Sequence, residues 1–136
     1  MNQTQTNPKK TLSVLWIFLT LNFIFCDVFT LMYSEELQQI LSGKMGETVI
    51  DQPFLLVFAF LMEIPMAMIL LSRFLPYRLN RWLNIVAGVL LTFVQVGSLF
   101  VGKPTLHYVF FSLIETAAAS FIVWLALRWK NEETAQ

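Results

Sequence analysis

Three carboxylates lie inside long apolar segments of the sequence, where an ionised side chain is costly. Asp27, Glu63 and Glu115 are each flanked on both sides by mostly hydrophobic residues. A charge at the centre of a bilayer costs at least about 2.5–3.5 kcal/mol. Every Lys and Arg, and the single His107, falls at the end of an apolar segment or beyond it. We therefore expect the acids to be protonated, to share protons in a network, or to face a cavity that brings a cation to them.

Amides and hydroxyls in the same segments are further candidates. Counted at about 1.5 Å per residue from the predicted outer ends, Asp27, Gln95, Glu115 and Glu63 lie about 9, 10, 12 and 15 Å deep. A similar depth on four segments predicts one polar pocket that opens to the outside, above an inner half that is nearly all apolar. The predicted ligand- or proton-binding set is Asp27, Glu63, Glu115, Gln95, Asn22, Thr92 and Ser112. For the amides and hydroxyls the alternative is a structural role, in which each forms a hydrogen bond between helices that stabilises the bundle by about 0.6–2 kcal/mol.

Four apolar segments must position these side chains. They cover residues 12–33, 54–75, 82–101 and 108–129. Each has about the 20 residues that an α-helix needs to cross the hydrocarbon core. Backbone groups find no water at that depth, so each segment must be helical. The prediction is an all-α, single-domain protein of residues 1–136, an antiparallel bundle of four transmembrane helices. The first segment is too long for a cleaved signal peptide.

The basic residues predict how the bundle is oriented. Seven of the nine fall on one side of the predicted membrane: Lys9, Lys10, Arg73, Arg78, Arg81, Arg128 and Lys130. Only Lys44 and Lys103 fall on the other side. Because cytoplasmic loops carry the excess of Lys and Arg, both termini are predicted to be cytoplasmic, with tails at 1–10 and 130–136.

The first outer loop has the features of a short interfacial helix. Ser34 could cap it, and Glu35 and Glu36 would then occupy the favourable end of the helix dipole. Leu37, Ile40 and Leu41 share one face, and Gly43 would end it. Such a helix could be a lid over the pocket or a simple part of the loop.

Small and polar residues recur at helical spacing and indicate which faces meet inside the bundle. In segment 54–75 these are Ala59, Glu63 and Ala67. Segments 82–101 and 108–129 contribute similar stripes, namely Asn84, Gly88, Thr92 and Gln95 on one and Ser112, Glu115, Thr116 and Ala119 on the other. Pro65 should kink its helix close to Glu63.

The composition excludes several classes of function. Apolar residues make up 57% of the chain and charged residues 13%, with a net charge of zero. Because basic residues are not in excess, the composition does not favour binding to nucleic acid. A single cysteine, Cys26, rules out a disulfide within the chain and a multi-cysteine zinc site. We expect no catalytic residues, no metal and no cofactor.

Several short sequences resemble an uncharacterised family of small bacterial four-helix membrane proteins. They are LMEIPMAM at 61–68 with LSR at 71–73, NRW at 80–82, and YVFFS at 108–112 with Glu115. More loosely, the chain is similar to DoxX-like proteins. The resemblance covers about residues 12–129 and implies a four-helix fold in the bacterial inner membrane. Asn22, Asp27, Glu63 and Glu115 match the family's polar pattern. The quinone-linked redox roles of DoxX relatives imply a lipophilic redox partner.

The sequence is compatible with three functions. The first is a non-enzymatic membrane protein whose acidic pocket binds a proton, a cation or a small amphiphile, with a role in transport among the options. The second is a membrane enzyme, or a redox accessory protein, that acts on a lipid or a quinone. The third is an assembly subunit whose carboxylates meet a partner's basic residue. The expected partners are the lipid bilayer, a small-molecule, cation or lipid ligand, and a second copy of the chain in a homo-oligomer, with no nucleic acid among them.

Overall fold

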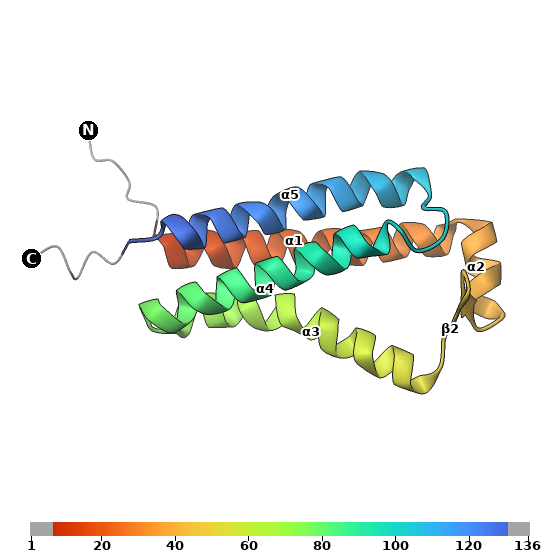
Figure 1. Cartoon of the computed structure of the whole chain (residues 1–136), viewed down its shortest axis with the longest axis horizontal. Coiled ribbons are helices and arrows are strands. Elements are labelled where there is room, and N and C mark those ends of the chain that lie inside the picture. Colours follow the sequence, from red (N-terminus) through yellow and green to blue (C-terminus); the bar gives the residue numbers. More distant parts are fainter. Residues whose placement is uncertain (1–6, 131–136) are drawn as a thin grey trace, which may run out of the picture.

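The structure is a computed structural model and describes residues 7–130. Four long helices form an antiparallel bundle (Figure 1). They are α1 (Pro8–Met32), α3 (Gln52–Phe74), α4 (Tyr77–Ser98) and α5 (Leu106–Arg128). All four are long and apolar enough to cross a membrane, so the predicted all-α fold with four candidate spans is confirmed. Both ends of the described chain lie at one end of the bundle, which we call the basic end (Figure 1).

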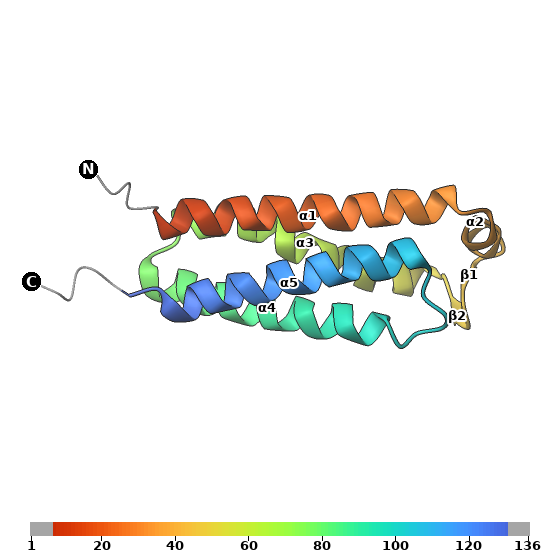
Figure 2. The ribbon, with the colours of Figure 1, turned by 90° about the horizontal axis from the view of Figure 1, so that it is seen from above.

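The core lies between the four long helices, each of which contributes buried apolar side chains. Contact is most extensive between α4 and α5, and α1 packs on both α3 and α5 (Figure 2). The largest fully buried apolar side chains include those of Trp16, Leu12, Leu19, Leu91 and Ile122. Gly88 allows α4 to approach α5 closely, because a Cβ there would lie 2.6 Å from Cγ2 of Val123. Small residues of this kind let the backbones of membrane helices come together.

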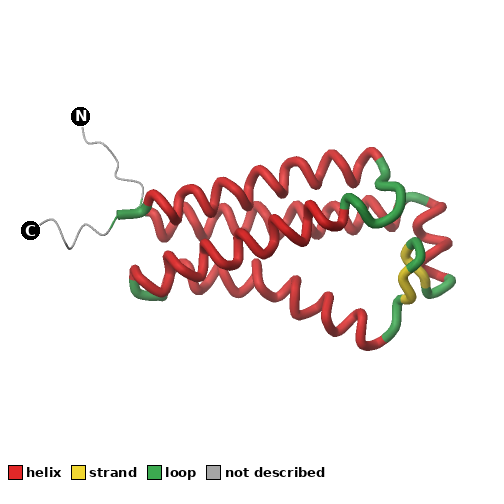
Figure 3. The backbone as a smooth tube through the Cα atoms, in the orientation of Figure 1, coloured by secondary structure: helices red, strands yellow, loops and turns green. Residues whose placement is uncertain are grey.

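Helix α3 separates from α4 toward the opposite end of the bundle (Figures 1 and 3). Its buried residues, Pro65, Met68 and Ser72, all belong to the half nearer the basic end. The predicted inner face of this helix is wrong, since Ala59 and Glu63 are exposed. The face of α3 that packs on the other helices is the one that carries Pro65, Met68 and Ser72. The small side chains of α3 do not mark this face.

A buried polar network holds the helices together near the basic end. Nε1 of Trp16 donates to Oδ1 of Asn84 at 2.7 Å, and the hydroxyl of Ser72 donates to the same oxygen at 3.3 Å. Nδ2 of Asn84 in turn donates to Oδ1 of Asn80 at 2.7 Å. Nδ2 of Asn80 donates to the Ser72 carbonyl at 2.7 Å. The inner half is therefore not nearly all apolar as predicted, because residues of α1, α3 and α4 satisfy one another's polar groups there.

Two of the helices, α1 and α4, begin nearer the basic end than the apolar segments predicted. Helix α1 begins at Pro8 and α4 at Tyr77, before the predicted residues 12 and 82. Polar and basic side chains satisfy the exposed helix ends, for example Nζ of Lys9, which donates to the Leu75 carbonyl at 2.8 Å. Hydropathy marks only the part of a helix inside hydrocarbon. The predicted tails at 1–10 and 130–136 lie mostly outside the described residues.

The connection from α1 to α3 contains the predicted short helix and a small hairpin. Helix α2 covers Ser34–Leu41, and Ser34 is its first residue and not its cap. Strands β1 (Lys44–Met45) and β2 (Thr48–Val49) pair antiparallel. Gly46 supports the tight turn between them with φ 59°. We call this the α2 end of the molecule.

Candidate functional site

A cavity of about 80 Å³ lies between the four long helices, in the half of the bundle nearer the α2 end. All four helices contribute to its wall. The lining residues are Phe23, Cys26, Asp27, Phe58, Leu61, Met62, Val94, Gln95, Ser98, Tyr108 and Glu115. Three residues of the predicted set, Asp27, Gln95 and Glu115, are among them. They come from α1, α4 and α5, and the antiparallel arrangement brings them to one level.

Glu115 is the unusual residue of this cavity. Its side chain is 1% exposed. Neither carboxyl oxygen has a hydrogen-bond partner among the described residues. Buried polar atoms are nearly always bonded in native proteins, and an unsatisfied one costs about 1–3 kcal/mol. The α5 helix therefore holds two unused acceptor atoms at the wall of a cavity.

Asp27 provides a second acid at the same cavity, but in a different setting. Its side chain is exposed, so it lies where the cavity reaches the surface of the bundle. No Lys, Arg or His lines the cavity. The site thus has two carboxyl groups, one enclosed and one accessible, with no positive group of the described chain beside them. Such a pair attracts a cation or a proton.

A short hydrogen-bonded chain fixes the polar wall between α4 and α5. Nε2 of Gln95 donates to the Ser112 hydroxyl at 2.7 Å. The Tyr108 hydroxyl donates to Oγ of Ser98 at 2.6 Å, and Oγ of Ser98 donates to the Gln95 carbonyl at 2.7 Å. Gln95 and Ser112 are therefore occupied with each other. The sequence analysis did not identify Tyr108 and Ser98 as site residues, because a Tyr near the end of a span is typical of the membrane interface.

The cavity also has an apolar wall, which is made of Phe58, Leu61 and Met62 of α3, Phe23 of α1 and Val94 of α4. Phe58 and Val94 are exposed, at 39% and 36%. This wall therefore continues to the side of the bundle, where α3 separates from α4. A group held at the carboxylates would reach lipid by this route.

Four residues of the predicted set do not line the cavity. Glu63 is exposed on α3. Asn22 and Thr92 bond back to carbonyls of their own helices, namely Phe18 at 2.9 Å and Gly88 at 2.7 Å. Ser112 only supports Gln95. Depth from the span ends does not say which way a side chain points, and the rotation of each helix decides which residues reach the cavity.

His107 joins α1 to α5 near the α2 end of the cavity. Its Nε2 lies 3.3 Å from the Thr30 hydroxyl and 3.2 Å from the Thr105 hydroxyl. The rings of Phe29 and Tyr33 lie 6.4 Å from the imidazole. The hydrogen bond and negative charge of Glu35 raise the pKa of the Tyr33 phenol above its usual value. This group ties the helix ends together beside an acidic helix, α2.

The side chains of this cavity are suited to holding a positive charge. Within residues 7–130 no group of three or more His, Cys, Asp or Glu side chains could hold a metal ion. The thiol of Cys26 is buried next to Asp27, and no described basic group lines the cavity to activate it. The two acids, Asp27 and Glu115, and a hydroxyl of the cavity wall can hold a positively charged group through charge and hydrogen bonds.

One family model, described as a family of unknown function (DUF6326), matches residues 2–136. The chain belongs to the DUF6326 family. Neither the curated proteins nor the solved structures contain a match. For this DUF6326 protein, therefore, function has to be argued from the cavity itself.

Proposed function

We propose that the protein is a non-enzymatic membrane protein that binds a small cationic amphiphile in the cavity of Asp27 and Glu115. The observation that carries the proposal is Glu115, which is buried with both oxygens unpartnered at a cavity wall. Polar or ionisable groups inside a membrane protein commonly mark the path of a substrate or an ion. A positively charged ligand would satisfy the acceptors that the described residues leave free.

The size and walls of the cavity support an amphiphile. A volume of about 80 Å³ has room for a few water-sized groups, such as an ammonium head, and not for a large molecule. The apolar wall of Phe58, Leu61 and Val94 leads from the acids to the side of the bundle. An alkyl chain could lie along it while the head contacts Glu115 and Asp27. The loose DoxX likeness also favours a lipophilic ligand, and transport of that ligand is one use of such a site.

We also propose the location and orientation of the molecule. The chain would lie in a bacterial cytoplasmic membrane, with the basic end inside and the α2 end outside. The support is the distribution of charge, with seven of nine basic residues toward the basic end. The cavity would then open toward the outer leaflet.

Thermal unfolding of the purified full-length protein in detergent tests the proposal. Octylammonium is added at increasing concentration, with octyl alcohol as the neutral amphiphile and sodium as the small cation. We expect octylammonium to raise the Tm and the other two to have little effect. Glu115→Gln and Asp27→Asn should abolish the response. Glu63→Gln is the matched control, because Glu63 is an acid within a span that lies outside the cavity.

The outcomes separate the alternatives. An equal response in the wild type, Glu115→Gln and Glu63→Gln would mean that octylammonium acts on the detergent or on the surface, and the proposal would be wrong. A response to sodium or to pH alone that needs Glu115 would replace the amphiphile with an inorganic cation or a proton. Binding of the neutral alcohol that ignores both acids would favour a lipid- or quinone-directed function.

A further inference from the structure

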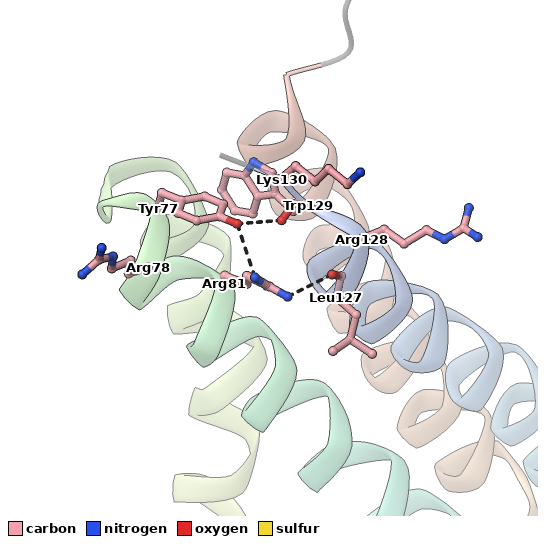
Figure 4. A pocket seen from close by; sticks show the side chains of 7 residues that line it. All are labelled: Tyr77, Arg78, Arg81, Leu127, Arg128, Trp129 and Lys130. Atoms are coloured by element: carbon pink, nitrogen blue, oxygen red, sulfur yellow. Dashed lines mark hydrogen bonds between the residues drawn. The ribbon is translucent and has the colours of Figure 1, made fainter. Parts of the chain in front are cut away.

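A second hollow lies at the basic end, far from the acidic cavity. It has a volume of about 950 Å³ and is formed where α4 begins and α5 ends (Figure 4). Its lining residues are Tyr77, Arg78, Arg81, Leu127, Arg128, Trp129 and Lys130. Four of these seven residues are basic, and none is acidic. The hollow therefore presents positive charge at the level where the helices end.

Arg81 is held rigidly at the centre of the hollow (Figure 4). Its Nε donates to the Ala126 carbonyl at 3.0 Å, and its Nη2 donates to the Leu127 carbonyl at 3.0 Å. Its Nη1 donates to the Tyr77 hydroxyl at 3.4 Å. Arg81 thus donates three of the five guanidinium N–H groups to described residues. Two N–H groups are left for a ligand. The bonds to the last carbonyls of α5 already hold the Arg81 guanidinium in place, so a ligand does not have to order it.

Three further cations, Arg78, Arg128 and Lys130, lie around this centre. Figure 4 shows Arg78 on one side of the hollow and Arg128 with Lys130 on the other, with Arg78 and Arg128 extended outward. All three are exposed, and the Arg128 guanidinium lies 4.7 Å from the centre of the Trp124 ring. Their outward direction suits contact with a layer of anions around the bundle.

The surroundings of the hollow are those of a membrane interface. Tyr77 and Trp129 pack edge to face, with ring centroids 5.2 Å apart. Leu127 and Trp124, at 53% and 45% exposed, lie next to the basic groups on α5. Aromatic rings of this kind favour the headgroup level, while exposed Leu faces acyl chains. A ligand with both an anionic head and an apolar tail fits both surfaces.

We infer that this hollow binds the phosphate of an anionic lipid headgroup. Arg81 offers its two unused N–H groups to the phosphate, and Arg78, Arg128 and Lys130 surround it. Arginine is well suited to phosphate because its planar fork donates two parallel hydrogen bonds. The acyl chains would lie along Leu127 and Trp124. In the orientation proposed above, the lipid belongs to the inner leaflet.

Native mass spectrometry of the full-length protein in detergent tests the inference. Short-chain phosphatidylglycerol, short-chain phosphatidylcholine and inorganic phosphate are each titrated, and the bound fraction gives an apparent Kd. We expect phosphatidylglycerol to bind most tightly. Each basic residue near a membrane surface contributes about a fivefold gain in binding. Arg78→Gln should thus weaken binding about fivefold, and Arg78→Gln/Arg128→Gln about 25-fold. Arg81 is left unchanged because it caps α5.

The matched control removes two charges at the other end of the molecule. Lys44→Gln/Lys103→Gln should bind phosphatidylglycerol as the wild type does. An equal loss in this control would mean that net charge alone sets binding, and the site would be wrong. Unchanged affinity in Arg78→Gln and in the double variant would also overturn it. Inorganic phosphate that competes at low millimolar concentration would show that the hollow takes a soluble phosphate and not a lipid.

Discussion

At the scale of single residues, the unpartnered carboxyl of Glu115 and the fully bonded amide of Asn84 represent opposite uses of a buried polar group. Asn84 accepts from Trp16 and Ser72 and donates to Asn80. Glu115 is equally buried and bonds to none of the described residues. A satisfied network specifies the packing of helices, whereas an unsatisfied group marks a place where stability is given up for function.

Replacement of Glu115 by methionine is expected to stabilise the protein. Met has a similar length, and its thioether needs no hydrogen bond. The free energy of unfolding should rise by about 1–3 kcal/mol, which is the cost of an unsatisfied buried polar group. Chemical or thermal unfolding in detergent without added ligand measures this. A clear loss of stability would show that the carboxyl makes a structural bond, and the site would lose its main support.

Replacement of Asn84 by alanine should have the opposite effect. It leaves the Trp16 indole N–H, the Ser72 hydroxyl and the Asn80 amide oxygen without their partner. We expect a loss of about 2–3 kcal/mol, since each orphaned group carries a desolvation penalty. Asn22→Ala is the control, because Asn22 bonds only to its own helix, and it should change stability by less than about 0.5 kcal/mol. Equal effects in the two variants would contradict the network's role.

Sequence reasoning found part of the site because polarity and depth are visible in a single chain. Asp27, Gln95 and Glu115 stand out as polar residues in apolar runs, and they do line one cavity. Glu63 stands out equally, yet it is exposed. The difference is the rotation of α3, which depends on how the helix packs. Tyr108 and Ser98 gave no signal, since their types and positions are ordinary at the end of a span.

At the scale of elements, the bundle depends on one close approach, between α4 and α5. Gly88→Val should weaken it, because a Cβ would lie 2.6 Å from Val123 Cγ2 and 3.3 Å from the Ala119 carbonyl oxygen. We expect a loss of about 1–3 kcal/mol from overpacking. Gly97→Ala on the same helix is the control, since nothing lies within 4 Å of a Cβ there. It should leave stability unchanged or raise it by up to about 1 kcal/mol. Comparable losses in both variants would mean that the close approach at Gly88 is not the cause of the loss, and the packing argument would be wrong.

The lengths of the helices were predicted less well than their number. Apolar runs locate the part of each helix that needs hydrocarbon, and four such runs gave four long helices. The additional turns at the basic end are made by polar and charged residues, as in α4 before residue 82. They are stabilised by tertiary contacts, such as Arg81 on the carbonyls of Ala126 and Leu127, which a single sequence does not display. The hairpin of β1 and β2 is too short to give a pattern of alternation.

At the scale of the whole molecule, charge is divided between the two ends. The basic end has the hollow around Arg81, and the α2 end has Glu35 and Glu36 on a helix above the cavity. This polarity relates the two sites. An amphiphile that carries a positive head would be drawn to one end, and an anionic lipid would be held at the other. Each site would then act on a different leaflet of the same membrane.

Labelling of single cysteines in intact bacterial cells tests the orientation on which this division depends. Cys26→Ser provides the background, and Ser42→Cys and Asn7→Cys place a thiol at the α2 end and at the basic end. Both positions are exposed, and neither change alters the charge. A membrane-impermeant maleimide should label Ser42→Cys in intact cells and Asn7→Cys only after permeabilisation, because the excess of Lys and Arg stays in the cytoplasm. The reverse pattern would place the acidic cavity in the inner half, and partial labelling of both would indicate two orientations. The reverse pattern would require the ligand of Glu115 to reach the cavity from the cytoplasmic leaflet.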